Sequence, residues 1–408
     1  MKKPFFLVLL LSSLVITACN NAGAQSNEEQ SKPIDASVST SSSEEDLEAD
    51  VEDLGVKDFH TDLMNQYLAD DWDSILTYVP QVSADKGTAT GTNMGDVSQP
   101  NPIRLHYDEL SAADNYYVEV AKDVKFTDSK IYETTDRFYD LYNTELGQKY
   151  YFRAADSEED LEEADIKKFT VSDVAPRNIH VDGVINFRDV GGWESSLVEG
   201  AKIKQGLYYR CAQFNNGRTT TITDEGKAMI KELGIKVDID MRDSYNVPSA
   251  SPASSDDWEV EIFKGSVASS TENWRWEGKN GTDDTIAKTY KSIFEKIAEA
   301  DENPIALHCT HGADRTGIVS YFLLGLLGAS KEDCSRDYVM TRFAGERSVL
   351  PYDCDKGESE VAKWNTKTEA LEGDSFAEKM YNHLHNDFGI EEETLETIRE
   401  LFIPGYQA

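Results

Sequence analysis

The sequence predicts a multidomain protein in which a β-sandwich is followed by an α/β domain. Short runs of alternating apolar and polar residues fill residues 76–173, and after position 176 such runs alternate with helical patterns. The chain has 408 residues, whereas single hydrophobic cores usually stop growing well below that length. Two or three domains are therefore expected.

The N-terminus has the pattern of a secretion signal. Two lysines precede an apolar run from Phe5 to Ile16, and small residues lead to Cys19. The segment ending at Cys19 resembles the lipobox of bacterial lipoproteins, in which the cysteine becomes the lipidated first residue. We therefore expect a signal peptide at 1–19 and an extracytoplasmic protein that is lipid-anchored to the cell membrane. The alternatives are an ordinary signal with a chance cysteine, or a buried helix.

Residues 20–55 are predicted to be a disordered acidic tether. They consist largely of Ser, Glu, Asp, Asn and Ala, a composition that cannot bury a core. The whole chain carries 76 acidic and 40 basic residues, a formal net charge of −36. Long-range electrostatics then repel nucleic acid and anionic lipid, so no nucleic-acid partner is expected and the lipid anchor is the expected membrane contact. An anionic substrate needs a local positive pocket.

The β-sandwich prediction for 76–173 rests on four runs bounded by Gly, Pro, Asp and Asn turns. These runs occupy residues 102–107, 115–120, 148–153 and 167–171. The stretch from Leu146 to Arg153 resembles the late strands of a fibronectin type III module, although the tryptophan of an early strand is missing, so an immunoglobulin-like sandwich stays open. The acidic run 158–163 is expected to be a solvated loop.

The second domain, assigned to 176–404, shows the strand and helix periodicities of an α/β fold. Strands are predicted at 235–241 and 304–309. Helices are predicted at Thr223–Leu233, Thr285–Ala298, Ile318–Leu327 and Glu391–Leu401.

A short loop between an apolar strand and an apolar helix contains the candidate catalytic residues. Backbone N–H groups and the helix dipole at such a junction suit a phosphate dianion. The same field lowers the pKa of Cys309, and the thiolate is the nucleophilic form. Arg315 offers a planar fork for two phosphate oxygens. The predicted phosphate-binding residues are Thr310, His311, Gly312, Ala313, Thr316 and Gly317.

Two further side chains have expected supporting roles. The hydroxyl of Thr316 can donate to the sulfur and ease its departure, and His308 can orient the loop through its ring N–H. The alternative is a buried structural cysteine with an arginine nearby by coincidence. The four cysteines beyond Cys19 lack metal-ligand spacing and are too few for a disulfide scaffold, although a single Cys334–Cys354 bridge stays open.

The segment His308–Gly317 resembles the Cys-x5-Arg signature of protein-tyrosine phosphatases, in the form of the bacterial tyrosine and dual-specificity branch. Three more segments resemble family motifs in the same order, namely Asn186–Gly192, Gly206–Arg210 and Asp238–Asp243. The resemblance implies an α/β phosphatase fold and hydrolysis through a phosphocysteine, with no metal or cofactor. Expected substrates are phosphorylated proteins or small phosphomonoesters, and the oligomeric state is not predicted.

The departures from the family pattern bear on the substrate. Ala313 stands where relatives that act on phosphoinositides carry lysine, so the sequence favours phosphotyrosine or mixed protein substrates. A phosphoinositide or inositol-polyphosphate phosphatase, and a surface binding protein with a degenerate phosphatase domain, are the alternatives. Cys211 stands where the family usually has serine; it is either a backdoor disulfide partner of Cys309 or a filler of a core gap.

The general acid is the least defined residue, because a carboxyl group is needed near the loop mouth. The resemblance implies Asp314, and Asp189 is the second candidate. A salt bridge of Asp189 with Arg188, Arg210 or Arg242 is the alternative for that residue. The segment 274–276, Trp-Arg-Trp, is expected to be either a substrate-facing lid or a loop anchor.

Overall fold

The computed structural model describes residues 48, 51–69, 100–215, 221–266, 284–343, 352–353 and 358–408. The chain divides into two units, 1–43 and 44–408, and the described residues all belong to the second. The predicted signal peptide, Cys19 and most of the tether lie outside the described residues. Within the described ranges, no helix combines the length and the apolar character needed to cross a membrane.

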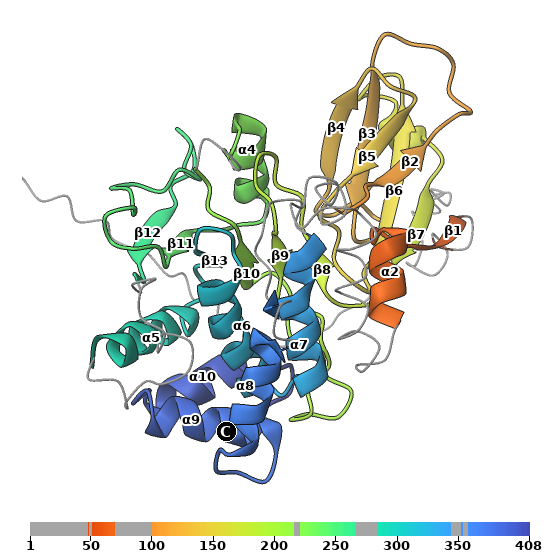
Figure 1. Cartoon of the computed structure of the whole chain (residues 1–408). Coiled ribbons are helices and arrows are strands. Elements are labelled where there is room, and N and C mark those ends of the chain that lie inside the picture. The colour runs from red at the N-terminus through yellow and green to blue at the C-terminus, as the bar shows by residue number, and fades with distance from the viewer. Residues whose placement is uncertain are drawn as a thin grey trace, which may run out of the picture. The chain divides into compact units, whose positions relative to one another are not determined.

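The N-terminal part of the second unit contains two β-sheets (Figure 1). Five strands lie in the order β1-β7-β6-β3-β4, and β2 pairs with β5 in a second, antiparallel sheet. The strands are β1 (Glu52–Lys57), β2 (Ile103–His106), β3 (Tyr116–Ala121), β4 (Lys130–Thr134), β5 (Phe138–Leu141), β6 (Lys149–Ala155) and β7 (Lys167–Val171). Each of the four runs named in the sequence overlaps a strand.

Alternating side chains bury one face of these strands. In β2, Ile103 and Leu105 are buried while Arg104 and His106 are exposed. Leu105 shares a core cluster with side chains of the other sheet, such as Phe169. On the outer face, the Arg104 guanidinium donates to both carboxylate oxygens of Asp140, each at 2.7 Å.

The structure revises two boundaries. Residues 52–55, assigned to the tether, are the first part of β1, which pairs in parallel with β7 through Glu52 and Lys167. Leu54 of this strand packs against the core. The sheet therefore begins before position 76. The acidic run 158–163 contains a 3-10 turn, Leu161–Glu163, and Leu161 is only 2% exposed, so the run is anchored by one apolar side chain.

The C-terminal part of the second unit, which contains the predicted catalytic loop and is called the catalytic part below, is built on a six-stranded sheet in the order β12-β11-β13-β10-β9-β8. The central strands pair in parallel, while β9 is antiparallel to both neighbours. All residues of β10, β11 and β13 are buried, as expected for parallel strands covered on both faces. The strands are β8 (Arg177–Asn178), β9 (Arg188–Asp189), β10 (Tyr208–Cys211), β11 (Val237–Asp240), β12 (Glu261–Lys264) and β13 (Ile305–His308).

The four predicted helices are present, within a few residues of the expected ends. Three other helices are α7, α8 and α9, and Ser330 caps α7 by accepting a hydrogen bond from the Asp333 amide at 3.0 Å. The helices are α4 (Asp224–Glu232), α5 (Asp284–Ile297), α6 (Asp314–Leu326), α7 (Lys331–Met340), α8 (Glu360–Glu369), α9 (Phe376–Asn386) and α10 (Glu392–Phe402). A 3-10 turn, Thr341–Phe343, follows α7, and β14 (Tyr352–Asp353) pairs with β15 (Glu358–Ser359).

Helix α6 is buried along nearly its whole length. Residues 315–326 are all buried, which is expected of a helix surrounded by other elements on every side. The contacts of α6 include α7 and α9 on one side and strands β10 and β13 on the other. Its N-terminus is therefore held at the end of the central strand β13.

A helix that the sequence analysis did not predict, α2 (Asp62–Ala69), packs on the catalytic part. Its Tyr67 is fully buried, and the Tyr67 hydroxyl donates to the backbone carbonyl of Arg336 on α7 at 3.2 Å. The Asn178 amide donates to the sulfur of Met64 at 3.2 Å. Just before α2, His60 Nε2 lies 2.9 Å from the carbonyl oxygen of Pro176.

Candidate active site

The loop between β13 and α6 contains four of the predicted phosphate-binding residues, 310–313, and the other two, Thr316 and Gly317, lie in the first turn of α6. Gly312 has a φ of +67°, and a Cβ at this position would lie 2.2 Å from the carbonyl oxygen of Cys211. Only glycine can bring the loop this close to β10. A Cβ on Gly317 would lie 2.5 Å from the Tyr338 ring, so the first turn of α6 is also packed tightly.

Cys309 lies at the base of this loop and is 4% exposed. Burial of the thiol opposes its ionisation, but the charge of Arg315 and hydrogen bonds from the hydroxyl and the backbone amide of Thr316 outweigh that effect, so the pKa of Cys309 is lowered. Among the described residues, no nitrogen or oxygen atom is a hydrogen-bond partner of the buried Thr316 hydroxyl, so this hydroxyl is available to the sulfur. The arrangement favours a thiolate nucleophile.

Arg315 is held beside the cysteine by the end of β11. Its Nη1 donates to the carbonyl oxygen of Met241 at 2.9 Å and lies 3.7 Å from Oδ1 of Asp243. The side chain is 10% exposed, so its charge acts in a site with little water. This position suits the predicted clamp on phosphate oxygens.

We expect Thr316→Val to raise the pKa of the Cys309 thiol, because the variant keeps the side-chain shape and removes the hydroxyl. The pH dependence of iodoacetamide alkylation, followed by mass spectrometry at Cys309, should shift upward by roughly one pH unit. Thr397→Val, at an exposed threonine of α10, is the control and should leave the profile unchanged. An unchanged profile in Thr316→Val would show that the hydroxyl does not stabilise the thiolate.

His308 is fully buried between two carboxylates. Its Nε2 lies 2.9 Å from Oδ1 of Asp238, and its Nδ1 lies 3.9 Å from Oδ1 of Asp240 and 2.9 Å from the carbonyl oxygen of Cys309. Burial alone would lower the pKa of His308, but Asp238 and Asp240 raise it to about 9. The charged ring therefore donates to the carbonyl oxygen of Cys309, which is the contact that the predicted orienting role requires.

This raised pKa predicts that the protein loses stability between about pH 6.5 and pH 9. Because the folded-state pKa lies above the ordinary value of about 6.5, the stabilisation is fully present below that value and is lost as the pH rises through 9. The total is on the order of 3 kcal/mol. In urea unfolding at pH 6.5, 7.5 and 9, His308→Gln should be less stable at pH 6.5 and show a flatter decline. If the stability of His308→Gln falls with pH as steeply as that of the wild type, His308 is not the source of the decline.

The two candidate acids have different surroundings. Asp314 begins α6 inside the loop, and its Oδ1 accepts a hydrogen bond from the Tyr338 hydroxyl at 3.1 Å. Asp189 is fully buried; it pairs with Arg177 at 3.0 Å and accepts from the amides of Gly191 and Gly206. A carboxylate enclosed in this way cannot reach a leaving group at the loop mouth. The arginine that pairs with Asp189 is thus Arg177, which was not among the three expected.

The other cysteines are structural in character. Cys211, Cys309 and Cys334 are free, and burial raises the pKa of Cys211 and of Cys334 well above the usual value. Cys211 thus fills space beneath the loop in this state. Cys354 and the segment 274–276 lie outside the described residues.

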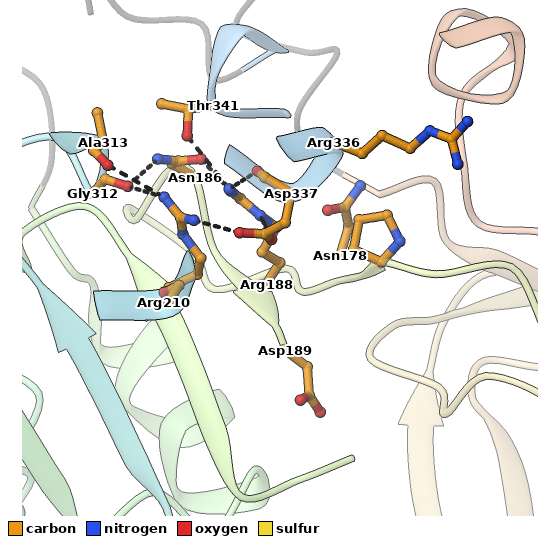
Figure 2. Close-up of polar contacts among 12 residues, drawn as sticks. Asn178, Asn186, Arg188, Asp189, Arg210, Gly312, Ala313, Arg336, Asp337 and Thr341 are labelled. Atoms are coloured by element: carbon orange, nitrogen blue, oxygen red, sulfur yellow. Dashed lines mark hydrogen bonds and ion pairs between the residues drawn. The ribbon is translucent and has the colours of Figure 1, made fainter. Parts of the chain in front are cut away.

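A buried network supports the loop from behind, and the sequence analysis missed its centre, Asp337 (Figure 2). Asp337 accepts from Arg188 Nε at 2.7 Å and from Arg210 Nη1. Arg210 Nη2 donates to the carbonyl of Gly312 at 2.7 Å, and Arg188 Nη1 donates to Oδ1 of Asn186 at 2.6 Å. The sequence signal that could have indicated a buried Asp337 is its position three residues after Cys334, on the apolar face of α7.

Comparisons with known proteins identify the family of the chain. A tyrosine-protein phosphatase of Nostoc commune is 24% identical over 131 residues, which cover 29% of this chain and 45% of that protein, so the chain spans less than half of its length. The crystal structure of P. aeruginosa TpbA covers 47% of this chain and 96% of its own at 15% identity and a TM-score of 0.28. A TpbA variant in complex with pTyr covers 44% and 96% at 15% identity and a TM-score of 0.24. The family model described as the tyrosine phosphatase family matches residues 179–404, more than half of the chain. The chain belongs to the tyrosine phosphatase family.

Proposed function

We propose that the chain hydrolyses phosphotyrosine, and to a lesser extent other protein phosphates, through a phosphocysteine intermediate. The observation that carries the proposal is the lowered pKa of the buried Cys309 thiol beside the Arg315 guanidinium, at the N-terminus of α6. A thiolate, a charged fork and convergent backbone N–H groups are the elements that an in-line attack on phosphorus needs. No metal or cofactor takes part in this mechanism.

In the proposed reaction, the Cys309 sulfur forms a bond to phosphorus while the bond from phosphorus to the tyrosine oxygen breaks. Arg315 holds two of the phosphate oxygens, and Asp314 gives its proton to the departing phenolate. The Asp314 carboxylate then accepts a proton from the water that cleaves the sulfur–phosphorus bond, so inorganic phosphate leaves and the thiolate is restored. The Thr316 hydroxyl stabilises that departing thiolate.

The preference for a single phosphate follows from the charges at the loop. Ala313 is 1% exposed and brings no cation, and Asp243 adds a carboxylate within 3.7 Å of Arg315. A headgroup with several phosphates needs several cations, whereas one aryl phosphate is neutralised by Arg315 and the helix dipole. Phosphoinositides are therefore expected to be poorer substrates than phosphotyrosine.

We further propose that the enzyme is secreted and anchored by a lipid on Cys19, and that its N-terminal part is a fibronectin type III-like sandwich. The support for the anchor is the sequence pattern around Cys19. The support for the sandwich is the strand order β7-β6-β3-β4 facing the pair β2-β5, with side chains of both sheets in one core cluster.

The direct test is hydrolysis of a phosphotyrosine peptide, a phosphoserine peptide and a phosphoinositide by residues 20–408, with a reducing agent and EDTA present. We expect the phosphotyrosine peptide to be cleaved fastest. Acid quenching during turnover should leave phosphate on the peptide that contains Cys309. Inactivity on every substrate would overturn the proposed function, and a preference for the phosphoinositide would overturn the proposed substrate class.

A further inference from the structure

We propose that Asp337 is a positioning residue of the active site: by clamping Arg188 and Arg210, it fixes the peptide groups that present N–H donors to the phosphate. This inference rests on the proposed function and deepens it. Asp337 lies outside the phosphate loop, on helix α7, and is 1% exposed. Its effect on the loop must therefore be transmitted by the side chains that it holds.

The first step is the clamp itself. The two carboxylate oxygens of Asp337 are shared between Arg188 and Arg210, and its backbone carbonyl accepts a second hydrogen bond from Arg188. Burial alone would raise the pKa of Asp337, but the two arginine charges lower it, so the carboxylate is ionised. Burial and the neighbouring charge of Arg210 lower the pKa of Arg188 to about 10. Asp337 is thus what allows two buried guanidinium groups to lie side by side.

The second step connects the clamp to the loop. Arg210 donates to the carbonyl oxygens of Gly312 at 2.7 Å and of Ala313 at 3.5 Å. Arg188 holds the side chain of Asn186, whose amide nitrogen donates to the carbonyl oxygens of His311 at 2.9 Å and of Gly312 at 3.1 Å. Figure 2 shows the carbonyl groups of Gly312 and Ala313 facing Arg210 and Asn186.

The third step is the geometry of the trans peptide group. In a planar trans peptide, the N–H of the next residue points opposite to the carbonyl oxygen. Because the carbonyl groups of His311 and Gly312 are drawn toward the network, the amides of Gly312 and Ala313 point away from it, toward the open side of the loop. The Ala313 carbonyl accepts a hydrogen bond from the Gly317 amide at 2.6 Å, so the first turn of α6 sets the direction of the Asp314 amide. Pre-aligned donors of this kind need no reorganisation when an anion arrives. The network also carries one more positive than negative charge close behind the anion site.

The test is Asp337→Asn, with Asp189→Asn as a matched control. Both aspartates are fully buried and paired with an arginine. In the described part of the chain, the side chain of Asp189 has hydrogen bonds to Arg177, Gly191 and Gly206, none of which lies in the loop. We expect Asp337→Asn to lose about tenfold to 10²-fold in kcat/KM, to bind inorganic phosphate more weakly and to shift the Cys309 alkylation profile to higher pH. Asp189→Asn should lower the thermal midpoint but leave phosphate affinity and the alkylation profile as in the wild type.

A second variant covers the case in which Asp337→Asn does not fold. Arg210→Lys keeps the charge, but one ammonium group cannot reach both Asp337 and the Gly312 carbonyl with the same geometry. It should weaken phosphate binding and raise the alkylation midpoint as well. If the folded variants bind phosphate and react with iodoacetamide like the wild type, the positioning role is excluded. If the wild type is inactive on all phosphomonoesters, the proposed function is excluded instead. The comparison of the Cys309 alkylation profiles of the variants and the wild type still tests the positioning role in that case.

Discussion

Cys309→Ser is expected to lose at least about 10³-fold in kcat on a phosphotyrosine peptide. A serine hydroxyl is not ionised near neutral pH, and the loop that lowers the pKa of the Cys309 thiol cannot bring an alcohol into that range. The variant retains the loop amides and Arg315, so it should still bind the peptide. Initial rates and equilibrium binding of the same peptide separate the two effects.

The matched control is Cys334→Ser, the same replacement at a fully buried thiol on α7. Burial raises the pKa of Cys334 well above its usual value, so this thiol is not a nucleophile, and kcat should stay close to that of the wild type. A Cys309→Ser variant with more than about a tenth of wild-type kcat would identify another group as the nucleophile. A loss in both variants would point to misfolding.

Arg315→Lys is expected to lower kcat/KM by a factor on the order of 10² to 10³. Lysine retains the positive charge, but it cannot donate to two phosphate oxygens in one plane while it also contacts the Met241 carbonyl, as Arg315 Nη1 does at 2.9 Å. The loss should appear mainly in kcat, because the fork follows the charge of the phosphoryl group into the transition state.

Comparison with Arg315→Met separates the charge of this residue from its shape. The charge of Arg315 is the strongest of the influences that lower the pKa of Cys309. The methionine variant should therefore shift the alkylation profile of Cys309 to higher pH, whereas the lysine variant should leave it near that of the wild type. Lys331→Met, at a half-buried lysine on α7, controls for the loss of a positive charge. Equal alkylation profiles in both Arg315 variants would contradict the electrostatic role.

Those parts of the site that are contiguous in sequence could be predicted from the sequence. The strand, the loop and the helix around Cys309 are recognisable from composition and spacing within residues 304–327, and the structure confirms these elements. The roles of nucleophile, clamp and orienting histidine rest on the same local pattern and stay predictions. Asp337 could not be found in this way, because Arg188 lies 149 positions away from it. Its contribution depends on the register of the sheet and on the packing of α7.

Strand periodicity could have narrowed the choice of salt-bridge partner for Asp189. Neighbouring residues of a strand point to opposite faces, so Asp189 cannot share a face with Arg188. In the observed register, Arg188 is opposite Arg210, while Asp189 is opposite Arg177. Two of the three expected salt-bridge partners could thus be excluded once β9 was known to pair with β10. The pairing itself is a property of the tertiary fold.

The packing of α2 on α7 has a consequence for the order in which the protein folds. The hydroxyl of Tyr67 and the carbonyl of Arg336 are separated by 269 positions, so all strands of the six-stranded sheet and helices α4 to α6 must be synthesised between them. Contacts this distant in sequence require the closure of a long loop and form late. Helix α2 leaves the ribosome well before its docking site exists. Docking of α2 therefore requires that the chain has been synthesised and folded to the end of α7.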